Sequence, residues 1–177
     1  LIYLIFLLVP VIDPKKKIKN MGSKYHSLKV LLTSFMSLLA LYILYSAKNE
    51  SLSNPNYIVL LMGILFLILG NYMKTIKANY FIGIRTPWTL ENETVWKETH
   101  KLAGKLWFGG GLLIVLGSLI LSKENTFPLM IAVIICISLI PIVYSYVRFK
   151  QLSNNQKVWK PWIKSKEKGS DKSNPVL

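Results

Sequence analysis

The sequence predicts an all-α, polytopic transmembrane bundle with four complete spans, a truncated first span and a cytoplasmic interfacial helix. Hydrophobic residues make up 52% of the 177 residues and charged residues only 17%, whereas soluble domains carry about 25% charged residues. Four long apolar runs follow one another along the chain and contain no acidic residue. Most basic residues lie between these runs, which is the pattern that sets membrane topology.

We predict the complete spans at residues 28–47, 57–73, 106–122 and 127–147. Each run approaches the length of about 20 residues that a helix needs to cross a hydrocarbon layer roughly 30 Å thick. In water, helices that are apolar on every side would need a core much larger than 177 residues can build. The runs therefore belong in lipid.

Residues 1–12 form a further apolar run, which as a helix would reach only about 18 Å. The chain begins with Leu1 instead of Met. We therefore expect the run to be the remaining part of a truncated span, with a helix lying in the membrane interface as the alternative.

The basic residues alternate between rich and poor connections. Residues 13–29, 74–105 and 148–177 contain six, six and eight Lys and Arg residues. Residues 48–56 contain only Lys48, and the last turn contains only Lys123, so 20 of the 22 basic residues fall on one side. Connections rich in Lys and Arg stay in the cytoplasm. We expect a multi-pass protein of the cell membrane with a cytoplasmic C-terminus.

The net charge of +14 would suggest nucleic acid as the partner of a soluble protein. Here no basic residue lies on a soluble module, so we expect contact with the anionic inner leaflet and no direct binding of nucleic acid. The chain divides into a transmembrane domain of residues 1–147 and a basic cytoplasmic tail of residues 148–177.

Two pairs of glycines recur at a spacing of seven residues within the spans. Gly63 and Gly70 share one helix face, and Gly110 and Gly117 share another. Small residues on one face let helix backbones approach closely in lipid. We predict that both faces are packing seams, in the simplest case against each other, although glycine is common in membrane helices.

Catalytic and metal-binding patterns are absent from the sequence. No ionisable residue lies in the middle of a span, where proton relays of transporters need one. We find no nucleophile with a matching base and no metal-ligand spacing. His26 and His100 lie in different cytoplasmic segments, and we expect both to be interfacial polar residues. We therefore predict no enzyme, no cofactor and no metal site.

The cytoplasmic connection of residues 74–105 is too long for a simple turn. We predict that Thr86, which precedes Pro87, is extended. From Thr89, which can cap a helix, we predict an amphipathic helix on the inner leaflet that runs into the next span. Whether this helix only anchors the bundle or also recognises a partner stays open. Its apolar face comprises Leu90, Val95, Trp96, Thr99, Leu102, Ala103 and Leu106.

Several stretches resemble the SdpI family of bacterial membrane immunity proteins: Gly70–Met73, Asn79–Leu90, Val95–Trp96, Thr99–His100, Ala103–Gly104 and the Ile12–Lys17 junction. The resemblance implies six helices with both termini inside, so that this chain would lack the first span, the extracytoplasmic segment after it and the start of the second span. It also implies bacteriocin immunity, which is protection against a membrane-active peptide toxin. A second implied activity is signal transduction, by sequestering a cytoplasmic autorepressor at the membrane.

On this basis we expect an integral membrane immunity protein of the bacterial cell membrane. A small membrane exporter of the toxic peptide is the alternative, and an enzyme acting on lipid or peptide is a third hypothesis without a recognisable site. In the first hypothesis Arg85 would supply charge, Trp88 an anchor, and Gly83 and Pro87 a fixed backbone. The expected binding residues are Asn79, Tyr80, Gly83, Arg85, Thr86, Pro87 and Trp88.

Overall fold

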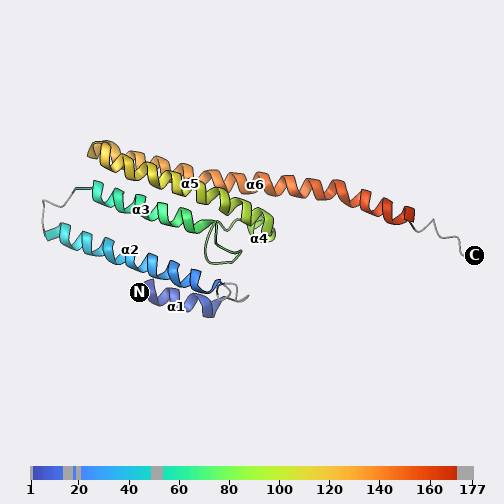
Figure 1. Cartoon of the computed structure of the whole chain (residues 1–177), viewed down its shortest axis with the longest axis horizontal. Coiled ribbons are helices and arrows are strands. Elements are labelled where there is room, and N and C mark those ends of the chain that lie inside the picture. The colour runs from blue at the N-terminus through green and yellow to red at the C-terminus, as the bar shows by residue number, and fades with distance from the viewer. Residues whose placement is uncertain (1, 14–17, 19–20, 49–53, 171–177) are drawn as a thin grey trace, which may run out of the picture.

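The computed structural model describes residues 2–13, 18, 21–48 and 54–170, and within them every regular element is a helix. The predicted all-α class is confirmed. Figure 1 shows the six helices in chain order: α1 (Ile2–Ile12), α2 (Ser23–Lys48), α3 (Asn56–Met73), α4 (Pro87–Glu91), α5 (Glu93–Ile120) and α6 (Lys123–Ser170).

Four of these helices are long and apolar enough to cross a membrane, namely α2, α3, α5 and the part of α6 up to Asn154. The predicted spans at 28–47, 57–73 and 127–147 lie inside α2, α3 and α6, and the span at 106–122 begins inside α5. By length and composition, the prediction of four complete spans is confirmed. The run at residues 1–12 forms the shorter apolar helix α1.

The two ends of the bundle differ in charge. In Figure 1 the start of α2, the end of α3 and the start of α5 lie at the same end of the bundle, and the α2–α3 and α5–α6 connections lie at the other. Lys24, Lys74 and Lys97 belong to the first end, whereas Lys48 and Lys123 belong to the second. The fold thus places the described parts of the connections rich in Lys and Arg on one side of the bundle, as their alternation along the sequence predicts.

Helices α3 and α5 touch through their backbones along a glycine seam. A Cβ atom at Gly70 would lie 2.3 Å from the backbone nitrogen of Phe108. Likewise, a Cβ at Gly104 would lie 2.8 Å from the carbonyl oxygen of Gly70, and one at Gly111 would lie 2.8 Å from that of Gly63. The prediction that Gly63 and Gly70 form a packing seam is therefore confirmed.

The prediction that this seam packs against Gly110 and Gly117 was wrong. Gly110 and Gly117 face α6, because Cβ atoms there would lie 2.7 Å from the Ile137 side chain and 2.5 Å from that of Leu129. Consecutive residues on a helix point about 100° apart. Helix α5 therefore has two glycine faces, one for α3 and one for α6, and lies between these two helices.

A compact apolar core holds these three helices together. Phe66 of α3 meets the ring of Trp107 of α5 edge to face at 5.2 Å between centroids. Trp107 Nε1 also donates a hydrogen bond to the Ile137 carbonyl of α6, at 3.1 Å. Ile114 of α5 is fully buried beside them. This packing fixes where the first turns of α5 lie relative to the end of α3.

Helix α2 is joined to the rest near its two ends. Near its start, Tyr72 of α3 donates a hydrogen bond from its hydroxyl to the Lys24 carbonyl. Near its end, the Tyr42 hydroxyl donates to the Asn54 carbonyl at 3.0 Å. An apolar pocket of about 360 Å³ lies between, with Leu32 of α2 and Leu69 of α3 in its lining.

The predicted helix of the cytoplasmic connection does run into the following span, as α5, but its surroundings differ from the prediction. Val95, Trp96 and Ala103 on its apolar face are at most 1% exposed. The preceding loop folds back over this face, so protein covers it instead of lipid. Helix α6 likewise continues without a break through the predicted domain boundary at residues 147–148.

Candidate functional site

The loop between α3 and α4 is organised around a buried asparagine. Asn79 is 1% exposed, and its side-chain oxygen accepts hydrogen bonds from the backbone N–H groups of Phe81 and Ile82, at 2.8 and 2.7 Å. Its amide nitrogen donates to the carbonyls of Lys77 and Ile82, at 2.8 and 3.1 Å. One side chain therefore ties both sides of the turn together, as asparagine does in turns.

A buried histidine joins the loop to α5. His100 is 1% exposed, and its Nε2 accepts the backbone N–H of Ile84 at 3.0 Å. Its Nδ1 lies 2.8 Å from the carbonyl oxygen of Trp96. Because a carbonyl can only accept, Nδ1 carries the proton and Nε2 has the lone pair, which defines a neutral imidazole.

Trp96 extends this connection to the end of α3. Its indole stacks on the His100 ring with centroids 4.0 Å apart, and its Nε1 donates to the Ile76 carbonyl at 2.9 Å. Gly83, with φ +105, lies against the Nε2 edge of the imidazole, where a Cβ would lie 2.3 Å from His100 Nε2. Only glycine permits both this backbone conformation and this approach.

Helix α4 begins with a capping box. Thr86 is extended, as predicted, with φ −85 and ψ 156. Its side chain accepts from the Thr89 N–H, and the Thr89 side chain accepts from the Thr86 N–H. Pro87 follows at the first helical position, where its missing N–H is not needed.

The prediction that Thr89 caps the long helix was wrong. Asn92 caps α5 instead, accepting from the N–H groups of Thr94 and Val95 at 2.9 and 3.1 Å. The reason is that the short helix α4 begins first, so that Thr89 falls inside it at the third position. There its hydroxyl also donates to the Ile84 carbonyl at 2.9 Å.

Helix α4 packs on α6 through a tryptophan. Trp88 Nε1 donates to the Ser145 hydroxyl at 2.5 Å, and the indole meets the Tyr146 ring edge to face at 5.2 Å between centroids. Next to this contact, Arg148 of α6 forms an ion pair with Glu98 of α5, including a hydrogen bond of 3.1 Å from Nη2 to Oε1. The loop, α5 and α6 therefore form one assembly at this end of the bundle.

The structure divides the expected binding residues into two groups. Asn79, Gly83, Thr86 and Trp88 are buried or half-buried and shape the loop or its docking. Tyr80, Pro87 and Arg85 are exposed.

Arg85 donates from Nη1 to the Tyr80 carbonyl at 2.5 Å. This hydrogen bond fixes part of its guanidinium at the loop surface, where the remaining N–H groups can meet a carboxylate or a phosphate.

Sequence reasoning missed the group at the centre of this assembly. His100 was expected to be an interfacial polar residue, and it is instead buried among hydrogen-bonding partners that lie 16 and 4 positions before it. Nothing in the sequence indicated the contacts of Ser145 or the Glu98–Arg148 ion pair, because the two residues of each contact come from different helices. The glycine at position 83, four residues after the turn asparagine Asn79, was the available sign of a close backbone approach.

Among the described residues, no group of three or more His, Cys, Asp and Glu side chains could hold a metal ion. The predictions that the chain is not an enzyme and uses no cofactor stay predictions. What the fold and the site define is a multi-pass helical membrane protein with a folded basic loop packed on two of its spanning helices.

Comparison with known proteins specifies this class further. Residues 75–145 match the model of the SdpI/YfhL protein family, and this region contains the loop, α4, α5 and the spanning part of α6 as far as Ser145. The chain is 35% identical over 95 residues to the protein named Immunity protein SdpI of Bacillus subtilis (strain 168). Through this region the chain is similar to the SdpI/YfhL family, in agreement with the resemblance found in its sequence.

The alignment with that relative covers 54% of this chain and 45% of the relative. The chain thus matches less than half of the relative's length. No solved structure matches the chain.

Proposed function

We propose that the chain is an integral membrane immunity protein that protects the producing cell against a membrane-active peptide toxin. The region matched to the family is the region in which the loop, α5 and α6 form one assembly. The relative matched there is named an immunity protein. In the proposed topology the basic end of the bundle and the C-terminus face the cytoplasm, because 20 of 22 basic residues lie on that side.

The observation that best supports this proposal is the way in which the loop presents Arg85. Asn79, His100 and the α4 capping box fix the backbone on both sides of this arginine. The arginine itself is exposed at the surface. A charged group on a rigid loop loses little entropy when it binds, which favours recognition.

We further propose that this surface sequesters a cytoplasmic autorepressor when toxin is present. The contacts of Trp88 with Ser145 and Tyr146 couple the loop to α6. Since α6 packs on α5 within the bilayer, a toxin that shifts these helices from outside or within the membrane would also shift the loop. The repressor would read this change at Arg85.

Replacing Arg85 by alanine is expected to lower toxin protection or repressor recruitment by about tenfold, the effect of losing one charge-assisted contact of roughly 1.5 kcal/mol. The test expresses the chain in toxin-sensitive bacteria and exposes them to a membrane-active peptide toxin. Survival is counted, and recruitment of a fluorescent autorepressor to the membrane is imaged.

Two matched variants separate recognition from general effects. Arg85→Lys keeps the charge and is expected to retain part of the activity, and Lys101→Ala removes a charge from α5 outside the loop and is expected to have no effect. Wild-type survival together with wild-type recruitment in Arg85→Ala, at equal membrane abundance, would refute the role of Arg85. Absence of protection by the parent chain would refute the immunity function. Protection that disappears when the membrane potential is collapsed, while toxin binding persists, would favour an exporter.

A further inference from the structure

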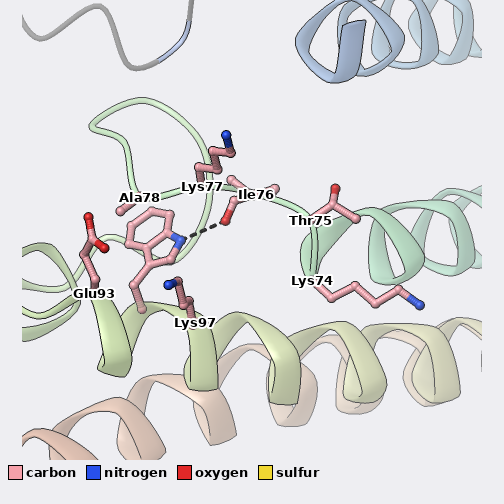
Figure 2. Close-up of a pocket in the computed structure, with 8 residues that line it drawn as sticks. Lys74, Thr75, Ile76, Lys77, Ala78, Glu93 and Lys97 are labelled. Carbon is pink, nitrogen blue, oxygen red and sulfur yellow. Dashed lines mark hydrogen bonds between the residues drawn. The ribbon is translucent and has the colours of Figure 1, made fainter. Parts of the chain in front are cut away.

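A pocket of about 520 Å³ opens between the end of α3 and the first turns of α5. It is separate from Arg85 and from the contacts between α4 and α6. Figure 2 shows it between the loop above and α5 below. Its lining combines long basic side chains with a tryptophan: Lys74, Thr75, Ile76, Lys77, Ala78, Glu93, Trp96 and Lys97.

The lining is positively charged, with three lysines and one glutamate. Lys74 and Lys77 come from the segment after α3 and Lys97 comes from α5, and their ammonium groups point in different directions in Figure 2. Glu98, which follows Lys97 in α5, forms an ion pair with Arg148. The three lysines are exposed, and their flexible stems allow the ammonium groups to turn toward a common anion.

The inner wall of the pocket is fixed in place. Trp96 is 1% exposed and donates from its indole to the Ile76 carbonyl at 2.9 Å, and Thr75 donates from its hydroxyl to the Tyr72 carbonyl at 2.8 Å. The backbone that supports the lysines is therefore ordered by its own contacts. A ligand would find a preformed wall and would have to order only the lysine side chains.

With α3 and α5 crossing the bilayer, the pocket would lie near the headgroup layer. Lys74 directly follows the spanning helix α3, and its backbone nitrogen would lie 3.4 Å from a Cβ at Gly104. Lys97 is about two helical turns nearer the start of α5 than Gly104, or roughly 10 Å farther from the hydrocarbon. The headgroup layer extends about 5 to 7 Å beyond the hydrocarbon on each side, so the pocket would begin within this layer at Lys74 and reach past its outer edge at Lys97, whose long side chain can turn back toward it.

We propose that this pocket binds the headgroup phosphate of an anionic phospholipid. The phosphate diester would be held by the ammonium groups of Lys74, Lys77 and Lys97, while the acyl chains would remain beside the apolar helices. Lysines bind phosphate as point charges and form short, charge-assisted hydrogen bonds. A lipid fits better than a soluble phosphate, because the pocket adjoins a spanning helix at the depth where lipid phosphates are concentrated.

The test measures binding of phosphatidylglycerol to the full chain in detergent micelles by native mass spectrometry, with zwitterionic phosphatidylcholine as the comparison lipid. The double variant Lys77→Gln/Lys97→Gln is expected to weaken phosphatidylglycerol binding about 25-fold, or about fivefold per lysine, which corresponds to roughly 1 kcal/mol each. Both substitutions are on exposed positions, so the fold is expected to persist.

The matched control is Lys101→Gln/Lys105→Gln, which removes the same charge from α5 outside this pocket. This control is expected to change binding less than threefold. Equal losses in both double variants would show that the attraction is diffuse and would overturn the proposal. Displacement of phosphatidylglycerol by millimolar glycerol 3-phosphate, with the same dependence on Lys77 and Lys97, would assign the pocket to a soluble phosphate and overturn the lipid assignment.

Discussion

Replacing Gly83 by alanine is expected to destabilise the protein by about 3 kcal/mol or more, the sum of a strained backbone, an overpacked contact and an orphaned donor. The backbone of Gly83 has φ +105, and the new Cβ would lie 2.3 Å from His100 Nε2. The imidazole would have to move, and the N–H of Ile84 would lose its acceptor. Unfolding by sodium dodecyl sulfate in mixed micelles, followed by tryptophan fluorescence, measures the loss.

Gly109→Ala is the matched control for this prediction. A Cβ at Gly109 meets nothing within 4 Å, and Gly109 lies inside α5, where alanine is favoured over glycine by about 0.5 to 1 kcal/mol. Unchanged or increased stability is expected for this variant. If Gly83→Ala also unfolded at the wild-type detergent concentration, the close approach of Gly83 to His100 would not contribute to stability.

Stability at Gly83 bears on function because the same contact positions Arg85. His100 accepts from Ile84, the residue directly before Arg85. Losing this hydrogen bond frees one side of the loop, while Asn79 and the α4 cap still hold the other parts. We therefore expect Gly83→Ala to reduce toxin protection even in the fraction of protein that remains folded.

The spanning helices could be predicted from the sequence because their signal is local. Apolar runs near 20 residues in length and the alternation of basic residues identified α2, α3, α5 and α6 without knowledge of any contact. The glycine seam on α3 was also predictable, since a spacing of seven residues places Gly63 and Gly70 on one face. Which face of α5 would cover it could not be predicted, because Gly104 and Gly111 are spaced by seven residues in the same way as Gly110 and Gly117.

The interior of the loop could not be predicted because it depends on partners far apart in the sequence. A histidine in a basic connection is typical of an interfacial residue, and nothing near His100 shows that Ile84 will donate to it from 16 positions away. Trp88 was expected to be an anchor. Its contact with α6 could not be foreseen for the same reason, because its acceptor Ser145 is 57 positions away. Several residues that were expected to bind a partner therefore shape the loop or its packing instead, namely Asn79, Gly83, Thr86 and Trp88.

Replacing Gly70 by alanine is expected to separate α3 from α5 and to destabilise the bundle by about 3 kcal/mol, at the upper end of the effect of overpacking. A Cβ there would lie 2.3 Å from the Phe108 backbone nitrogen and 2.9 Å from the Phe108 Cα. No change of side-chain conformation can relieve a contact with backbone, so the helices themselves must move apart. The same detergent titration measures the stability of the variant.

The contact at Gly63 provides a graded comparison on the same helix face. There the nearest atom to a new Cβ is the Val115 Cγ2, at 2.8 Å, which belongs to a side chain and can shift, and the nearest backbone atom, the Val115 nitrogen, is at 3.0 Å instead of the 2.3 Å found at Gly70. We expect Gly63→Ala to cost less than Gly70→Ala, and Gly109→Ala to cost nothing. Equal stability of the Gly63 and Gly70 variants would show that α3 can slide or tilt to admit a methyl group anywhere along the seam. In that case the spacing of seven residues would not fix the level at which α3 and α5 meet, nor the position of the loop above them.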